Sequence, residues 1–191
     1  ISALIASSLG AKVALVERYL MGGDCLNVGC VPSKALIRAA RRTHEARAAG
    51  ALGLHVPEGQ LPDFGAAMER LREIRAKVSH EDSAARYTQE FGIDVYLGRA
   101  RFTGGDTIDI DGTELRFKKA VIATGARAAA PPIPGLAETG YLDNETVFSI
   151  LERPARLAVI GAGPIGCEMA QTFQRLGSRV TVLEQAGQIL G

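Results

Sequence analysis

Residues 157–166 read LAVIGAGPIG, an apolar segment that runs directly into the pattern G-x-G-x-x-G. A helical segment follows, and a second apolar segment, RVTVLE, ends at Glu184. In this strand–turn–helix–strand context the pattern predicts a dinucleotide-binding βαβ unit, because glycines allow a tight turn and a helix N-terminus offers N–H groups to a pyrophosphate. Glu184 is placed to accept hydrogen bonds from a ribose hydroxyl. The alternative is a βαβ turn whose glycines serve packing alone. The residues of the predicted nucleotide turn are Gly161, Ala162, Gly163, Pro164, Ile165 and Gly166.

The end of this pattern occurs a second time near the start of the chain. LGAKVALVER at 9–18 and LGSRVTVLEQ at 176–185 align without gaps at an offset of 167 residues, so Glu17 corresponds to Glu184. The same offset places the glycine motif of the first copy upstream of Ile1. We therefore expect the chain to begin inside the first helix of one nucleotide-binding unit and to end within a second.

The segments between the two copies have their own periodicities. Residues 32–53 predict a helix with a proline in its first turn, and residues 63–92 predict a longer helical region with an apolar stripe. Short alternating strands with glycine-rich turns are expected over 93–117. The apolar stretch 118–125 predicts a buried strand, and the proline-rich residues 126–135 predict a linker.

Composition restricts the classes of partner and compartment. The 191 residues are 47% hydrophobic and 23% charged with a net charge of +1, which is typical of a soluble globular protein and gives no support for nucleic acid or an anionic membrane as a partner. No apolar stretch approaches the roughly 20 residues of a membrane span. Three cysteines are too few for a disulfide-stapled secreted scaffold, so we expect a cytoplasmic protein.

Two of the three cysteines, Cys25 and Cys30, lie five positions apart in GGDCLNVGCVPSK, residues 22–34. A zinc site needs about four ligands, and no further Cys or His pair completes one, so we expect no metal site. The scattered histidines His44, His55 and His80 lack ligand spacing. Passive burial of the thiols and a redox-active disulfide remain as alternatives. A glycine and a proline after Cys25 indicate irregular backbone, which makes bridging possible.

The motifs together resemble the class I pyridine nucleotide–disulfide oxidoreductases. GGDCLNVGCVPSK resembles the active-site motif of that family, AVIATGARAAAPPIPG (120–135) its second flavin-contact segment, and LAVIGAGPIGCEMAQ (157–171) its NAD(P) fingerprint. Within the class, the stretch 144–177 most resembles mercuric reductase-like proteins, with dihydrolipoamide dehydrogenase next. One departure is Asp24, where many members have threonine near the flavin pyrophosphate.

The resemblance implies an α/β fold with two Rossmann-like dinucleotide-binding domains of the glutathione-reductase type, both incomplete in this chain. The implied domains are an FAD-binding domain over 1–125, a linker over 126–153 and the start of an NAD(P)-binding domain over 154–191. It also implies an enzyme that acts as a homodimer in cell redox homeostasis, and we expect this chain to be incomplete without the family's C-terminal part.

The resemblance further implies residue roles. NAD(P)H would reduce FAD, which would pass electrons to the Cys25–Cys30 disulfide and then to a disulfide, dithiol or metal-ion substrate. Cys25 would be the interchange thiol and Cys30 the thiol in charge-transfer contact with the flavin, while Lys34 would pair with Glu168 near the isoalloxazine. The expected FAD contacts are Glu17, Gly22, Gly23, Asp24, Cys25, Lys34, Ala100, Thr124 and Gly125.

The sequence leaves alternatives open for the nucleotide cofactor and for the activity. Glu184 favours NAD over NADP, because a 2′-phosphate would meet its negative charge and residues 185–191 contain no Arg or Lys. A redox sensor whose disulfide reports oxidation state without turnover is the rival to an oxidoreductase. A nucleotide-binding interaction domain without redox function is a weaker rival.

Overall fold

The computed structural model describes residues 1–53, 57 and 62–190, so that His55 lies outside the described residues. The chain divides into two compact units, each built from two segments: unit 1 from 1–27 and 76–129, and unit 2 from 28–75 and 130–191. This division follows packing, whereas the predicted FAD domain, linker and NAD(P) domain follow cofactor sites. The predicted domain boundaries therefore stay a prediction.

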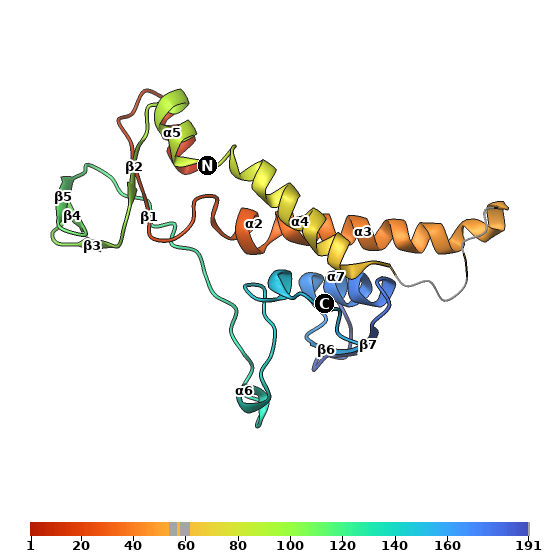
Figure 1. The fold of residues 1–191 in the computed structure, drawn as a ribbon. Helices are drawn as coiled ribbons and strands as arrows, with labels where there is room; N and C mark the ends of the chain where they lie inside the picture. Colours follow the sequence, from red (N-terminus) through yellow and green to blue (C-terminus); the bar gives the residue numbers. More distant parts are fainter. Residues whose placement is uncertain (54–56, 58–61, 191) are drawn as a thin grey trace. The chain divides into compact units, whose positions relative to one another are not determined.

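Unit 2 contains the predicted βαβ unit. Strands β6 (Arg156–Ile160) and β7 (Arg179–Leu183) pair in parallel, and helix α7 (Pro164–Arg175) connects them (Figure 1). Gly163 is the N-cap of α7 and Pro164 its first helical residue, where the missing N–H of proline costs no hydrogen bond. The expectation of a strand, a glycine turn, a helix and a second strand is confirmed.

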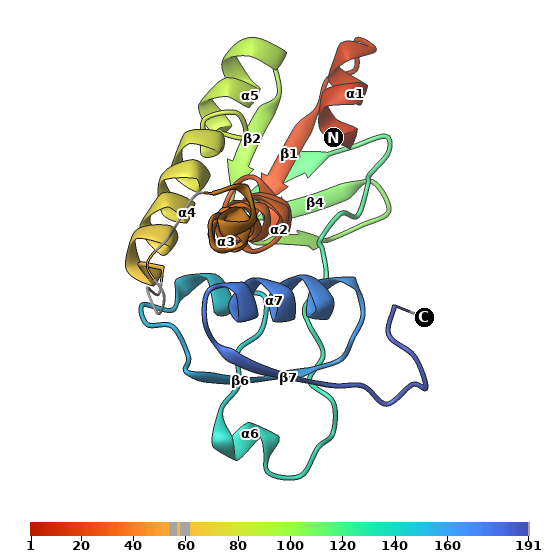
Figure 2. The same ribbon diagram turned by 90° about the vertical axis from the view of Figure 1, so that its right-hand side faces the viewer.

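The core of unit 2 forms where helix α3 (Cys30–Ala48) packs on α7, which in turn lies on β6 and β7 (Figure 2). The short 3₁₀ helix η1 (Ala49–Leu52) extends α3. Helix α4 (Phe64–Ser79) contributes Phe64, Met68 and Leu71 of its predicted apolar stripe, whereas the stripe's last two members, Ile74 and Val78, are half-buried and lie outside this core. The buried core residues are Leu36, Ala40, Phe64, Met68, Leu71, Phe148, Met169, Phe173 and Leu176. These contacts fix the start of α3 relative to the glycine motif within one unit.

The predicted helical region 63–92 is two helices rather than one. α4 ends at Ser79, and α5 (Ala84–Phe91) begins after Ser83, whose hydroxyl accepts a hydrogen bond from Arg86 N at 3.2 Å. A side-chain cap of this kind starts a new helix, because it satisfies a backbone N–H that has no partner within the helix.

Unit 1 holds helix α1 (Ser2–Ser8) and two small sheets. Strands β1 (Ala14–Glu17) and β2 (Asp94–Leu97) pair in parallel. Strands β3 (Ala100–Phe102), β4 (Thr107–Ile110) and β5 (Thr113–Arg116) form an antiparallel meander, as the alternating pattern over 93–117 predicts. Helix α2 (Gly23–Val28) begins at the second residue of the glycine pair Gly22–Gly23.

The buried strand predicted over 118–125 is wrong. Val121 and Ile122 are each 73% exposed, and among the described residues no strand pairs with this segment. A run of apolar residues becomes a strand only when a neighbouring strand accepts its backbone hydrogen bonds, and here β1 pairs with β2 alone. The predicted linker over 126–153 contains two short elements, α6 (Leu136–Thr139) and η2 (Val147–Ser149).

Candidate functional site

The cysteine stretch contains a break between two helices. α2 ends at Val28, Gly29 has a non-helical backbone (φ −133°, ψ −115°), and α3 begins at Cys30. The irregular backbone expected between the cysteines is therefore confirmed. Cys25 lies on α2, Cys30 is the first residue of α3, and both side chains are exposed, so that each is accessible to a reactant. Their pairing as a disulfide stays a prediction.

The ion pair expected between Lys34 and Glu168 is present in unit 2. Lys34 lies one turn after Cys30 on α3, and its Nζ lies 2.5 Å from Glu168 Oε1 on the first turns of α7. The two side chains are 60% and 40% exposed, so solvent weakens the attraction and the pair contributes little to stability. Its structural effect is to connect the helix that begins at Cys30 with the helix that begins at the glycine motif.

The glycine pair that precedes Cys25 forms a turn that only glycine tolerates. Gly22 and Gly23 both have positive φ (91° and 58°), and a Cβ on Gly22 would lie 2.3 Å from a methyl carbon of Leu26. The Asn27 side-chain amide donates to Met21 O at 3.1 Å and to Gly23 O at 2.9 Å. Asn27 was not predicted as a site residue, although an amide side chain four residues after a glycine turn is a signal for such a brace.

A second glycine turn of unit 1 lies beside the first. Gly125 has φ 72°, and a Cβ built on it would lie 3.7 Å from Asp24 Oδ2. The structure therefore brings together two of the expected flavin contacts, and Thr124 precedes this turn in an exposed segment without regular structure. Such turns fit a ligand that approaches the backbone closely. The Asp24 carboxylate adds only acceptors and negative charge there, which does not fit a pyrophosphate.

The remaining expected flavin contacts of unit 1 lie on strands. Glu17 is the last residue of β1, and its Oε1 accepts a hydrogen bond from Tyr19 N at 2.8 Å. Ala100 is the first residue of β3. The carboxyl end of a parallel strand is the place where α/β sheets bind nucleotides, so the position of Glu17 fits a ribose contact.

The glycine motif of unit 2 shows why each glycine is required. Gly161 has φ 100°. Gly163 is the N-cap of α7, and a Cβ at this position would have no neighbouring atom within 4 Å, so the backbone there is open to a ligand. A Cβ on Gly166 would approach the Gly161 carbonyl oxygen to 2.1 Å, so the first turn of α7 packs directly on the turn that precedes it. Between these glycines, Ala162 is buried and Ile165 is exposed. The geometry matches the three functions expected of a dinucleotide motif: a tight turn, close backbone approach and close helix packing.

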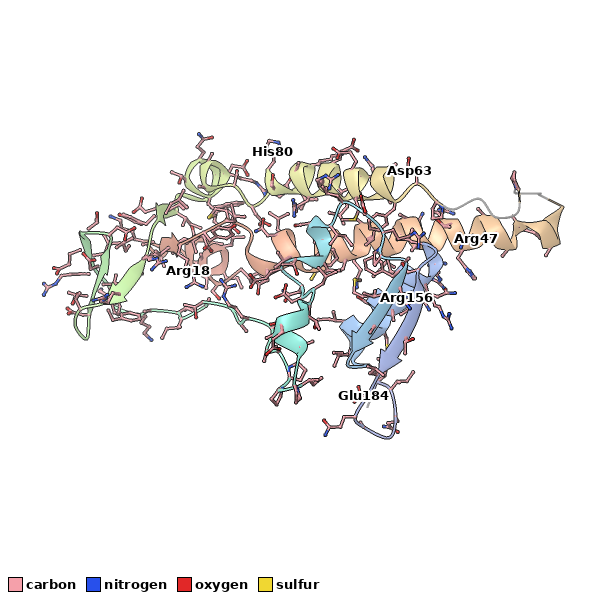
Figure 3. The ribbon with its side chains drawn as sticks, turned by 60° about the horizontal axis from the view of Figure 1, so that its bottom comes forward. Arg18, Arg47, Asp63, His80, Arg156 and Glu184 are labelled. Carbon is pink, nitrogen blue, oxygen red and sulfur yellow. The ribbon has the colours of Figure 1, made fainter. Side chains whose placement is uncertain are left out.

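Glu184 lies one residue beyond β7, at the end of the strands opposite to Arg156 (Figure 3). Its Oε2 accepts a hydrogen bond from Ala162 N at 2.6 Å and its Oε1 accepts one from Ala186 N at 2.8 Å. The hydrogen bonds from Ala186 and Ala162 hold the pKa of the Glu184 carboxyl below its ordinary value, so it carries a negative charge at neutral pH. The bond to Ala162 was not predicted, because a backbone donor leaves no signal in the sequence.

The described part of the chain contains neither a metal-ligand cluster nor a membrane-spanning helix. In residues 1–53, 57 and 62–190, no three His, Cys, Asp or Glu side chains gather as the ligands of a metal ion would. Within the same residues, every helix is too short or too polar to cross a bilayer.

Comparison with known proteins defines the class. The pyridine nucleotide-disulphide oxidoreductase family matches residues 2–191, and the chain belongs to this family. The mixed α/β architecture is that of flavoprotein disulfide reductases: the HOCl-induced flavoprotein disulfide reductase RclA from Escherichia coli superimposes with a TM-score of 0.81 at 30% identity, covering 98% of this chain and 40% of that one.

The sequence relatives include several mercuric reductases. The mercuric reductase of Bacillus cereus is 36% identical over 189 residues, which are 99% of this chain and 30% of the relative. The mercuric reductase of Streptomyces lividans is 39% identical over 191 residues, which are 95% of this chain and 39% of the relative. The chain thus spans between 30% and 40% of the length of these proteins.

Proposed function

We propose that the protein is a flavin-dependent oxidoreductase that passes electrons from NAD(P)H through FAD to the Cys25–Cys30 pair and then to a disulfide or metal-ion acceptor. One observation carries the proposal. The ion pair between Lys34 and Glu168 connects the helix that starts at Cys30 to the helix that starts at the nucleotide motif. Because α3 also packs on α7 through the buried core of unit 2, Cys30 and the nucleotide motif belong to one packed unit, which supports electron transfer between them.

The residues that would hold the two cofactors lie at the glycine turns of each unit. Glu17, Gly22, Gly23 and Gly125 would receive FAD, and the turn beginning at Gly161 with Glu184 would receive NAD(P). Bound FAD would supply the two-electron relay between the nicotinamide and the cysteines. Lys34 would stabilise negative charge near that relay, as a fixed cation does in a partly desolvated site.

The two cysteines would perform the disulfide chemistry. Two electrons and two protons convert their disulfide to two thiols. The Cys25 thiolate then attacks an acceptor disulfide, which forms a mixed disulfide and releases one acceptor thiol. The Cys30 thiolate attacks Cys25 Sγ, re-forms the Cys25–Cys30 bond and releases the second acceptor thiol. A divalent metal ion could instead accept the electron pair of the two reduced cysteines. Similarity to mercuric reductases supports this second kind of acceptor.

The third cysteine offers a matched control for this proposal. In the intact protein, Cys25→Ser and Cys30→Ser should each abolish NADH-dependent reduction of a small disulfide or of Hg²⁺. Cys167→Ser should retain it, because a serine hydroxyl can still donate to Ala162 O as the Cys167 thiol does. Mass spectrometry of the oxidised protein should find a peptide cross-linked between Cys25 and Cys30. Unchanged turnover in both serine variants would refute the assignment. A cross-linked pair without turnover on either acceptor would identify the redox sensor instead.

The cofactor preference rests on Glu184. Its ionised carboxylate would accept hydrogen bonds from the ribose hydroxyls of NADH and would repel the 2′-phosphate of NADPH. We expect a preference for NADH of at least about tenfold in kcat/KM, and Glu184→Arg should narrow or reverse the ratio. Steady-state kinetics with both nucleotides measures it, and a preference of the unaltered protein for NADPH would overturn this part of the proposal.

A further inference from the structure

The backbone N–H and C=O groups of Ala162 both form hydrogen bonds with the chain that follows β7. Ala162 is the second residue of the glycine motif and is fully buried (0% exposed). Its N–H donates to Glu184 Oε2 at 2.6 Å, and its carbonyl oxygen accepts from Leu190 N at 3.0 Å. The Cys167 thiol donates to the same carbonyl oxygen, with Sγ at 3.3 Å. The shape of the glycine turn is therefore fixed by groups outside the turn.

Glu184 contributes the charged side chain among these hydrogen bonds. One carboxylate oxygen binds the turn and the other binds Ala186 N, so a single charged group connects β6 to the segment after β7. Hydrogen bonds to an ionised carboxylate are shorter and stronger than neutral ones. The N-cap residue Gly163 makes no side-chain capping bond, and Gly161 has positive φ. The N-cap residue of the turn therefore contributes no side-chain hydrogen bond that would hold the turn's shape.

We infer that Glu184 is a positioning residue that holds the glycine turn in its nucleotide-binding shape through the Ala162 N–H, separately from any contact with the ribose. The inference rests on the proposed nucleotide site. A glutamine at position 184 would offer one neutral carbonyl oxygen to the two N–H groups of Ala162 and Ala186, where the carboxylate offers two charged oxygens. The bond to the buried Ala162 N–H would then be weakened or lost, and a buried donor without an acceptor drives the backbone to rearrange. A ligand that binds the turn would then have to restore its shape on binding.

The choice of nucleotide separates the two roles of Glu184, which are the bond to the turn and the contact with the ribose. ADP can use both the turn and the ribose hydroxyls, whereas 2′,3′-dideoxy-ADP can use the turn alone. Glu184→Gln in the full chain should weaken binding of 2′,3′-dideoxy-ADP by about tenfold, measured by calorimetry. The matched control is Glu152→Gln, an exposed acid of the same unit that forms no ion pair among the described residues. If Glu184 acted on the ribose alone, the substitution would weaken ADP binding and leave the dideoxy nucleotide unchanged, which would overturn the inference.

The second readout needs no nucleotide. A short bond to a carboxylate shifts an amide proton resonance downfield, so the Ala162 amide should move upfield and exchange faster with solvent in Glu184→Gln, while the amide of buried Phe173 on α7 should keep its shift. An unchanged Ala162 resonance would overturn the inference even if nucleotide binding changed. If neither nucleotide binds the unaltered chain, the proposed nucleotide site is wrong, and the Ala162 resonance still decides whether Glu184 braces the turn.

Discussion

The two copies of the repeat, residues 9–18 in unit 1 and 176–185 in unit 2, have the same local structure. Gly10 and Gly177 both have positive φ, at 82° and 101°. Each copy then enters a parallel strand, which ends at Glu17 in the first copy and one residue before Glu184 in the second. Each acid accepts a hydrogen bond at 2.8 Å from the backbone N–H two residues later: Glu17 from Tyr19 and Glu184 from Ala186. The gap-free sequence alignment thus extends to individual hydrogen bonds.

The surroundings of the two copies differ. Leu176 is fully buried (0% exposed) in the core that α3, α4 and α7 form, whereas the equivalent Leu9 is 82% exposed. Glu184 also accepts a bond from Ala162 of the glycine motif, while the position equivalent to Ala162 does not fall within the 191 residues. The turn, strand and acid are therefore encoded locally, whereas burial depends on the elements that cover them.

The largest expected effect comes from truncating the two leucines. Leu176→Ala removes a side chain from a closed core and should lower the free energy of unfolding by about 2–5 kcal/mol. Leu9→Ala alters an exposed side chain and should change it by less than about 0.5 kcal/mol. Urea unfolding followed by circular dichroism measures both. Equal losses would show that unit 1 covers Leu9 in solution, and the described contrast between the copies would be wrong.

The contrast between the copies also shows which parts of the fold and of the candidate site the sequence can predict. The βαβ unit around Gly161 was predicted because its glycines, proline and apolar periods act within a few residues. The Lys34–Glu168 pair, 134 positions apart, followed only from resemblance to a family. The strand expected over 118–125 was wrong because strand formation depends on a partner elsewhere in the chain. The Glu184–Ala162 bond was missed because the donor is a backbone group.

The next effect is smaller and should be equal in the two copies. Alanine disfavours positive φ, so Gly177→Ala and Gly10→Ala should each lower the free energy of unfolding by about 1–2 kcal/mol. Asparagine tolerates this conformation better, so Gly→Asn at either site should be less destabilising. The same urea titrations measure the four variants. A neutral Gly10→Ala beside a destabilising Gly177→Ala would show that the two copies do not share a turn geometry.

The smallest effect concerns pH and the Glu184 carboxylate. Its pKa is held below the ordinary value first by the Ala186 N–H and then by the Ala162 N–H. A carboxyl whose folded pKa is lowered stabilises the fold above its unfolded pKa, near 4.3, and this contribution disappears as the pH falls through the lower folded value. Glu184→Gln should therefore lower Tm slightly at neutral pH, and the two proteins should converge as the pH falls through the lowered pKa of the folded protein. Glu17→Gln, at the equivalent position without a bond to Ala162, is the matched control. Thermal unfolding of all three proteins across this pH range measures the convergence. If the difference in Tm between Glu184→Gln and the unaltered chain stays constant with pH, the charge of Glu184 is not what stabilises the turn.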